Sequence, residues 1–189
     1  MNNFTDKLKL FGLDDKQAIK MSSIFSTQLI LNKNDYLLRE KSVCMQVGFI
    51  VEGMCRYFYV SDSGDEVTRW VSLENEFVIS FGSFIKQSKT HENIQAIVPT
   101  KILAAQKEQW DNLCNEEEFA RFFWTKSIEE YLIGIEARVY SLIALNAKNR
   151  YNSLIQDYPK LVRAVPDKYL ASILGIKPRH LSRLRASTK

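Results

Sequence analysis

The sequence predicts an α+β protein in which antiparallel strands come first, a long helix follows, and two short helices lie near the C-terminus. Three patterns support this order. Apolar and polar residues alternate from residue 45 to residue 52, which is the period of a strand. Apolar residues recur every three or four positions from residue 128 to residue 142, which is the period of a helix. Residues 167–186 fit two short helices joined by a tight turn.

The first part of the chain changes from a helical to an extended pattern. Residues 4–31 carry apolar side chains at helical spacing, and we predict that they are helical. From Tyr36 the pattern is that of strands, with a tight turn at Glu52-Gly53. The aromatic spacing of residues 77–86 predicts a short helix between the strands. Further strands are predicted at 66–73, 94–98 and 101–105. Short strands separated by turns favour an antiparallel roll or barrel.

A long helix is predicted from about residue 116. Glu116, Glu117 and Glu118 favour its start, because acidic groups stabilise a helix N-terminus through the helix dipole. One face steps by four and three positions, which is the seam of helices that pair along their length. The seam consists of Ile128, Leu132, Ile135, Val139 and Leu142. We expect it to form a dimer interface; the alternative is that it packs on the β domain of its own chain.

Residues 167–186, with the sequence DKYLASILGIKPRHLSRLRA, have the pattern of a helix-turn-helix. Small Ala171 lets the second helix cross closely, and Gly175 suits the left-handed conformation that ends the first helix. Pro178 fits the first turn of the second helix, where a missing N–H has no cost. The exposed positions of the second helix are Lys177, Arg179, His180, Ser182, Arg183 and Arg185. A short helix with this many basic residues fits the major groove of DNA.

The positive charge of the chain is concentrated at its C-terminal end. Residues 147–189 hold ten Lys and Arg against two acids, a net +8, whereas residues 1–146 hold 16 basic and 20 acidic residues, a net −4. This asymmetry is expected of a polyanion-binding segment joined to a non-binding one. The alternative is an ordinary solvated basic tail. Four of the basic residues are expected to strengthen the field along a DNA backbone: Lys148, Arg150, Lys168 and Lys189.

The composition excludes several classes of protein. With 46% hydrophobic residues, 7 Gly and 4 Pro, the chain is neither disordered nor collagen-like. It lacks both the roughly 18 continuous apolar residues of a membrane span and the pattern of a signal peptide, so we expect a cytoplasmic protein with no membrane partner. Cys44, Cys55 and Cys114 form no paired motif, and the two histidines, His91 and His180, lie far apart. We therefore expect no metal, no cofactor and no catalytic residues, and hence no enzyme.

The order of these elements resembles the Crp/Fnr superfamily of bacterial regulators over nearly the full chain. Residues 49–56 (FIVEGMCR) resemble its strand–Gly–strand hairpin, residues 121–138 its dimer helix, and residues 150–159 the start of its DNA-binding domain. The resemblance implies a cyclic-nucleotide-binding-like β-roll at 1–115, a dimerisation helix at 116–146 and a helix-turn-helix domain at 147–189. It also implies a homodimer that binds a palindromic site on double-stranded DNA and controls transcription.

The same resemblance implies an effector pocket, but its phosphate-binding residues are altered here. The family has Gly-Glu before a short helix and an Arg-Ser or Arg-Thr pair further on, which bind the ribose and the cyclic phosphate. In this chain Glu76 is present without the Gly, and Glu92-Asn93 replaces the Arg pair. A carboxylate facing a phosphate costs roughly 1 kcal/mol or more. We therefore predict that cyclic AMP does not bind usefully.

Two uses of the pocket are open at this point. In the first, four aromatic side chains fill it and make the roll a packed scaffold: Trp70, Phe77, Phe81 and Phe84. In the second, it admits an unidentified small-molecule effector with three polar contacts: Arg56, Arg69 and Gln95.

The leading interpretation is a homodimeric DNA-binding transcription regulator of Crp/Fnr type that does not respond to cyclic AMP. Arg179 and Arg183 are the candidates for base-edge contacts, and the other exposed residues of the second helix for phosphate or secondary contacts. RNA polymerase is a further candidate partner. The chain ends four residues after Arg185, so we expect the contacts of the family's β-hairpin wing to be missing. The alternative is a ligand-sensing module whose terminal helices dock on a protein instead of DNA.

Overall fold

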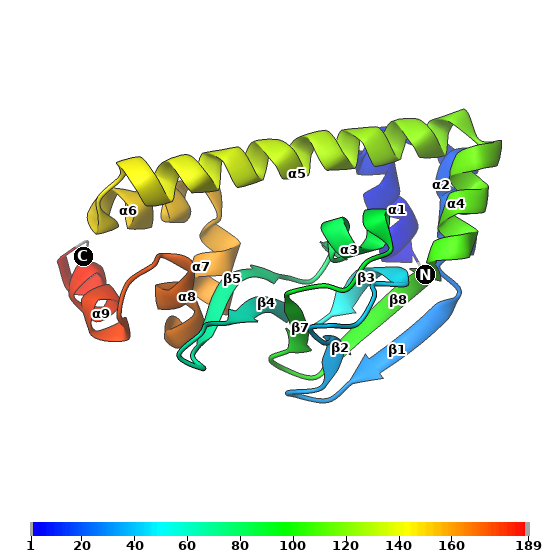
Figure 1. The fold of residues 1–189 in the computed structure, drawn as a ribbon. Helices are drawn as coiled ribbons and strands as arrows, with labels where there is room; N and C mark the ends of the chain where they lie inside the picture. Colours follow the sequence, from blue (N-terminus) through cyan, green and yellow to red (C-terminus); the bar gives the residue numbers. More distant parts are fainter. Residues whose placement is uncertain (1, 188–189) are drawn as a thin grey trace.

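The computed structural model describes the backbone of residues 2–187 and the side chains of residues 4–186. A β domain lies in the middle, with short N-terminal helices at one end and a helical C-terminal part at the other (Figure 1). The long helix α5 (Glu118–Ala144) crosses the whole length of the molecule and joins the two ends (Figure 1). No helix in the described part of the chain is long and apolar enough to span a membrane.

Two short helices precede the sheets, α1 (Asn2–Leu10) and α2 (Asp15–Ser23). Asp14 starts α2 with a capping box: its side chain accepts from the Gln17 N–H, and the Gln17 side chain accepts from the Asp14 N–H. The predicted helix through residue 31 is wrong at its end, because β1 begins at Thr27. Burial alternates along β1, and its backbone pairs with a strand near residue 100, so pairing decides its conformation.

The strands of the described chain form two four-stranded antiparallel sheets, in the orders β1-β8-β3-β6 and β2-β7-β4-β5. Their bounds are β1 (Thr27–Leu31), β2 (Tyr36–Leu38), β3 (Gln46–Glu52), β4 (Cys55–Val60), β5 (Glu66–Ser72), β6 (Phe77–Val78), β7 (Asn93–Ala96) and β8 (Thr100–Gln106). The predicted antiparallel roll is therefore confirmed, with strand ends shifted by up to two residues. The predicted helix at 77–86 is shorter than expected: its first residues form β6, and α3 covers Phe81–Lys86.

The burial of β3 differs from the predicted alternation, whereas the turn that follows it is as predicted. Residues 47–50 are all buried, so both faces of β3 are covered, whereas Met45 and Val51 are exposed rather than part of an inward face. The predicted turn at Gly53 is confirmed, with φ at +94°. A Cβ there would lie 2.5 Å from the Pro99 carbonyl oxygen, so the close approach of the two chain segments requires glycine.

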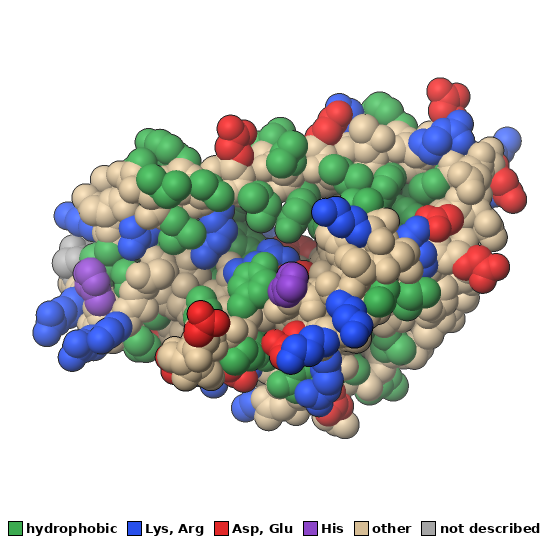
Figure 2. Space-filling view, viewed as in Figure 1, with side chains coloured by type: hydrophobic (Ala, Val, Ile, Leu, Met, Phe, Trp, Pro, Cys, Tyr) green, Lys and Arg blue, Asp and Glu red, His purple; other side chains and the backbone are tan. Residues whose placement is uncertain are grey.

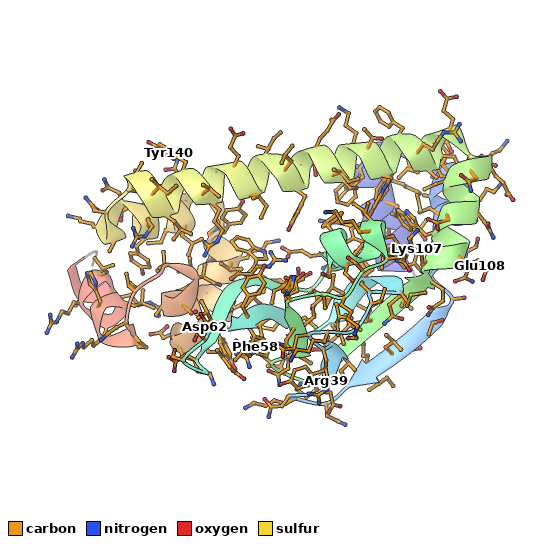
Figure 3. All side chains as sticks on the ribbon, in the orientation of Figure 1. Arg39, Phe58, Asp62, Lys107, Glu108 and Tyr140 are labelled. Carbon is orange, nitrogen blue, oxygen red and sulfur yellow. The ribbon has the colours of Figure 1, made fainter. Side chains whose placement is uncertain are left out.

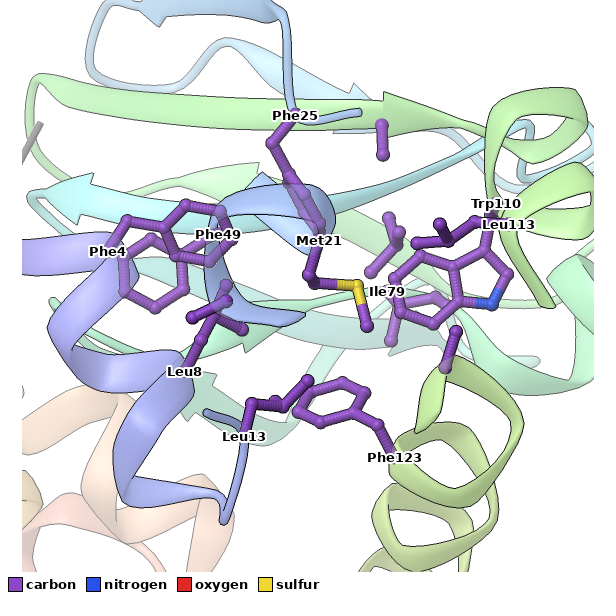
Figure 4. Close-up of a cluster of buried hydrophobic side chains, with 14 of the residues drawn as sticks. Phe4, Leu8, Leu13, Met21, Phe25, Phe49, Ile79, Trp110, Leu113 and Phe123 are labelled. Carbon is purple, nitrogen blue, oxygen red and sulfur yellow. The ribbon is translucent and has the colours of Figure 1, made fainter. Parts of the chain in front are cut away.

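The N-terminal core lies between α1, α2, the first sheet, α4 (Lys107–Glu116) and the start of α5 (Figure 4). Phe4, Leu8 and Met21 pack there against Phe49 and Phe123. The sequence pattern does not reveal α4 as a separate helix. Helix α4 is instead stabilised by Trp110 and Leu113, which are buried in this core.

The C-terminal part consists of four short helices, α6 (Ala147–Asp157), α7 (Pro159–Ala164), α8 (Asp167–Ile173) and α9 (Pro178–Ser187). We call these helices the head. Asn146 caps α6 with its side chain, which accepts from the Asn149 N–H and separates α6 from α5. The head packs on β5: Ser172 Oγ accepts from the Thr68 N–H at 2.8 Å and donates to the Thr68 carbonyl at 3.2 Å.

Candidate nucleic-acid interface and effector pocket

Helices α8 and α9 form the helix-turn-helix that the sequence predicts. The Gly175 N–H donates to the Ser172 carbonyl and the Ile176 N–H to the Ala171 carbonyl, both at 3.0 Å. With φ of Gly175 at +66°, these two bonds make a Schellman motif that ends α8. Pro178 begins α9, where its missing N–H costs no helical hydrogen bond.

The inner faces of the two helices form the core of the head. Leu170, Ala171 and Leu181 are fully buried, and Leu174 and Leu184 are nearly so. Ala171 has no exposed surface, in agreement with the expectation that the second helix crosses closely there. The outer face of α9 is thereby held in one orientation by packing on the other side of the helix.

Five of the six predicted DNA-contacting residues lie on that outer face with exposed side chains: Lys177, Arg179, His180, Ser182 and Arg183. Basic side chains project from this end of the molecule in the space-filling view (Figure 2). Among the described residues, no carboxylate lies within 4.0 Å of the charged groups of Lys177, Arg179 or Arg183. These three cations are therefore available to an external anion.

Arg185 is placed differently from the other five residues. It is half-buried, forms an ion pair with Asp167 at 2.9 Å and donates to the Val162 carbonyl at 3.3 Å. These bonds fix α9 to α7 and α8, so Arg185 is better placed to orient the helix than to contact DNA.

The four residues expected to strengthen the electrostatic field along DNA also differ in their exposure. Lys148 and Lys168 are exposed. Arg150 points inward, and its guanidinium donates to the Leu174 carbonyl at 2.9 Å and to the Leu145 carbonyl at 2.5 Å. Lys189 lies outside the described residues.

The predicted seam of α5 is only partly covered by its own chain. Ile128 and Ile135 are half-buried, whereas Leu132 is 64% exposed and Val139 49% exposed. Further exposed apolar residues of α5 are Phe122, Ile133, Tyr140, Leu142 and Ile143. Tyr140 points away from the rest of the molecule (Figure 3). The outer side of α5 therefore presents a long strip of exposed apolar side chains, and Val139, Tyr140 and Leu142 near its C-terminal end also border the space between α5 and the head.

Glu92, at the position that the sequence resemblance assigns to the family's phosphate-binding arginine, forms a buried ion pair. Its carboxylate accepts from Arg69 Nε at 2.7 Å, and the two side chains are 8% and 18% exposed. Burial alone lowers the pKa of Arg69, but the Glu92 carboxylate more than offsets this, so the pKa is raised and the guanidinium stays charged. The pair satisfies internally the charge that an effector phosphate would otherwise meet.

The other polar pocket residues are also bound to protein groups. Arg56 donates to Gln95 Oε1 from Nε at 2.9 Å and from Nη2 at 2.6 Å, and to Glu66 Oε2 at 2.6 Å. Asn93 Oδ1 accepts from the Glu40 N–H at 3.0 Å. Glu76 is exposed and accepts from the Leu73 N–H at 3.0 Å. Each of these side chains therefore already has a partner within the protein.

The prediction that four aromatic residues fill a single pocket is wrong. Phe77 packs in the N-terminal core, with its ring centroid 5.4 Å from that of Phe49. Phe81 stacks on Tyr131 of α5 at 4.4 Å, and Trp70 meets Tyr158 of the head at 4.9 Å. Phe84 is buried in the same core as Phe77, and Phe81 also packs against it. Of the four residues only Trp70 lies elsewhere, because β5 belongs to the other sheet and faces the head.

A cavity of about 630 Å³ lies between α5, β5 and the head. The space-filling view is hollowed beneath α5 in the middle of the molecule (Figure 2). The walls of the cavity include Arg69, Trp70, Tyr131, Ile135, Arg138 and Tyr158. Sequence reasoning found Arg69 and Trp70 but missed Arg138 and Tyr131. The available signal is Arg138, the one basic residue between residues 127 and 147 of the chain.

The cysteines are poor candidates for redox or metal chemistry. Burial raises the pKa of Cys55 to about 12, and burial together with Asp111 raises that of Cys114 to about 11. The pKa of Cys44 is also raised by burial. At neutral pH these thiols are therefore protonated and weakly nucleophilic. Within the described residues, no three His, Cys, Asp or Glu side chains gather as metal ligands.

Cyclic AMP is expected not to bind, because Glu92 already holds Arg69 and is a carboxylate at the position that the resemblance assigns to the phosphate-binding arginine. Calorimetric titration of the purified chain with cyclic AMP and cyclic GMP should show no saturable heat in the micromolar range. Saturable micromolar binding of either nucleotide would show that the Arg69–Glu92 pair opens for a phosphate.

The described part of the chain thus joins two antiparallel sheets, a long connecting helix and a helix-turn-helix head. Residues 28–117 match the family model of the cyclic nucleotide-binding domain. No curated protein sequence matches the chain. Solved structures do match over most of its length, and they include Crp/Fnr regulators.

One similar structure is FixK2 from Bradyrhizobium japonicum, with a TM-score of 0.73 and 16% identity over 85% of this chain and 83% of that chain. Another is a CooA mutant from Carboxydothermus hydrogenoformans, with a TM-score of 0.72 and 16% identity over 95% and 82%. A third, from Eubacterium rectale, is described as a transcriptional regulator of the Crp/Fnr family, with a TM-score of 0.68 and 13% identity over 92% and 82%. Residues 28–117 thus resemble a cyclic nucleotide-binding domain, and the chain has a fold similar to that of these Crp/Fnr regulators.

Proposed function

We propose that the chain is a homodimeric, DNA-binding transcription regulator of Crp/Fnr type that does not respond to cyclic AMP. The observation that carries the proposal is the outer face of α9 on its helix-turn-helix scaffold, where none of the described carboxylates pairs with Lys177, Arg179 or Arg183. The proposal assigns no catalysis to the chain and places its action in the cytoplasm, where such a regulator meets promoters and RNA polymerase.

The base contacts are assigned to Arg179 and Arg183. They are four residues apart on α9, so they lie on one side of the helix about one turn apart. A guanidinium in a major groove pairs bidentately with guanine O6 and N7. Lys177, His180 and Ser182 are assigned to phosphate or secondary contacts, with Lys148 and Lys168 strengthening the field along the backbone.

The dimer is assigned to the outer side of α5. Leu132 and Val139 stand on the exposed apolar strip, and such a strip on a long helix is the surface that a coiled-coil partner covers. A two-fold axis along α5 would present two copies of α9 to successive major grooves, about 34 Å apart. The DNA site would then be palindromic.

The alternative, a module that docks on a protein through its terminal helices, is less well supported. The exposed face of α9 is cationic and polar, whereas protein-docking helices usually present an apolar face.

Selection from a random duplex library with the purified chain tests the proposal. We expect enrichment of a two-fold symmetric sequence with half-sites about one helical turn apart. A chain that enriches no sequence, or only an asymmetric one, would contradict DNA reading by a symmetric dimer.

A further inference from the structure

The cavity between α5, β5 and the head combines cationic and apolar walls. Its volume of about 630 Å³ falls within the range of pockets that hold small organic molecules. Of the predicted effector-pocket residues, Arg69 and Trp70 line it, whereas Glu76 and Asn93 do not. Most of its lining comes from the long helix and the head.

Three guanidinium groups stand on the walls of this cavity. Arg69 is paired with Glu92, but Arg138 and Arg150 have no carboxylate within 4.0 Å among the described residues. Asp157 is the one acid of the lining and is itself exposed. Burial lowers the pKa of Arg138, and the positive charges of Arg69 and Arg150 lower it further. Among the described residues, the lining of the cavity therefore carries more positive than negative charge.

Arg138 and Arg150 also keep unused donors. A guanidinium has five N–H groups. Arg138 donates through Nη2 to the Ile173 carbonyl at 2.6 Å, and Arg150 uses Nε and Nη1 for carbonyls of Leu174 and Leu145. The remaining N–H groups can therefore bind an anion without breaking these bonds.

The rest of the lining suits the apolar part of a ligand. Trp70, Tyr131 and Ile135 contribute side chains on the β5 and α5 sides, and Leu154 and Tyr158 contribute them from the head. Flat and aliphatic side chains of this kind hold an aromatic or branched carbon skeleton by burial of apolar surface.

We propose that this cavity binds a small organic anion, with its acidic group at Arg138 and Arg150 and its apolar body against Trp70 and Tyr131. The inference goes beyond DNA binding and does not depend on it. Because Arg138 and Arg150 also hold the last carbonyls of α8, beside the Gly175 turn, the ligand would lie directly against the helix-turn-helix.

The test uses the full chain without DNA and 1-naphthoate as the probe, with neutral 1-naphthamide as its uncharged counterpart. Calorimetry should show saturable binding of 1-naphthoate, and binding of 1-naphthamide should be at least about tenfold weaker, since hydrogen bonds to charged groups are the stronger ones. Arg138→Gln should weaken 1-naphthoate binding by about tenfold or more. Arg121→Gln is the matched control, because Arg121 is also on α5 and donates to helix-end carbonyls, those of Cys114 and Asn115, but lies outside the cavity.

A second pair of variants tests the cavity without removing a charge. A Cβ at Gly134, which lines the cavity, meets nothing within 4 Å, and glycine is a poor helix former, so substitution there should not unfold the chain. Gly134→Leu should weaken binding by narrowing the space, whereas Gly134→Ala should leave it nearly unchanged. The inference is overturned if 1-naphthoate does not bind, if 1-naphthamide binds equally well, or if neither Arg138→Gln nor Gly134→Leu weakens binding.

Discussion

Replacing Arg179 and Arg183 together by alanine should almost abolish specific DNA binding. Each arginine that pairs bidentately with a base contributes about 1–3 kcal/mol of discrimination, so the double variant should lose roughly 2–6 kcal/mol in each half-site. This corresponds to a fall in affinity of roughly 30-fold to 10⁴-fold for each half-site of the selected duplex. Both side chains are exposed and do not pack in the core, so the melting temperature should hardly change.

Two further variants separate base reading from general electrostatics. Lys177→Ala, at a proposed phosphate contact, should weaken binding to all duplexes alike, whereas Arg183→Ala should also relax the sequence preference. Arg163→Ala, at an exposed arginine on α7 away from the outer face of α9, is the matched control for the loss of one charge in the head. Unchanged binding of the selected duplex by the Arg179→Ala/Arg183→Ala variant would remove the assignment of α9 as the reading helix.

Replacing Leu132 and Val139 together by aspartate should convert the dimer to a monomer. Two charges placed in the apolar strip of α5 would have to be buried in the interface without partners, which is strongly unfavourable. In the monomer the same residues are exposed, so the fold should persist. Sedimentation equilibrium should give twice the chain mass for the original sequence and the single chain mass for the variant.

The loss of the dimer should also reduce affinity for a palindromic site by about 10²-fold to 10⁴-fold, because the two heads no longer bind as one unit. Glu130→Lys changes the charge at an exposed position outside the predicted seam and should leave both the mass and the affinity nearly unchanged. A monomeric original chain, or a dimer that survives Leu132→Asp/Val139→Asp, would place the interface elsewhere.

Much of the fold follows from local sequence signals. Gly175 and Pro178 mark the helix-turn-helix because one adopts the left-handed conformation and the other fits a first helical turn. Gly53 marks the hairpin for a similar reason. By contrast, Leu29 continues a helical apolar spacing yet belongs to β1, since its conformation is decided by pairing with β8. Helix α4 likewise depends on the distant core into which Trp110 packs.

The candidate site was harder to predict because its decisive contacts join distant parts of the chain. Arg69 was expected to contact an effector, and its partner Glu92 was expected to repel one, but the sequence does not reveal that the two neutralise each other. Arg185 carries the same charge as Arg183 two residues earlier and was predicted to share its role. Only the fold shows that Asp167 and the Val162 carbonyl hold it in the head.

The salt dependence of DNA binding tests the central claim most directly, because a cationic head that contacts phosphates must release counterions. Fluorescence anisotropy with a labelled duplex should give the affinity of the purified chain over a series of KCl concentrations. With several phosphate contacts shared by two heads, we predict that log K falls against log[KCl] with a slope of about −4 or steeper. A flat salt dependence, or no binding to duplex DNA even at low salt, would contradict the account.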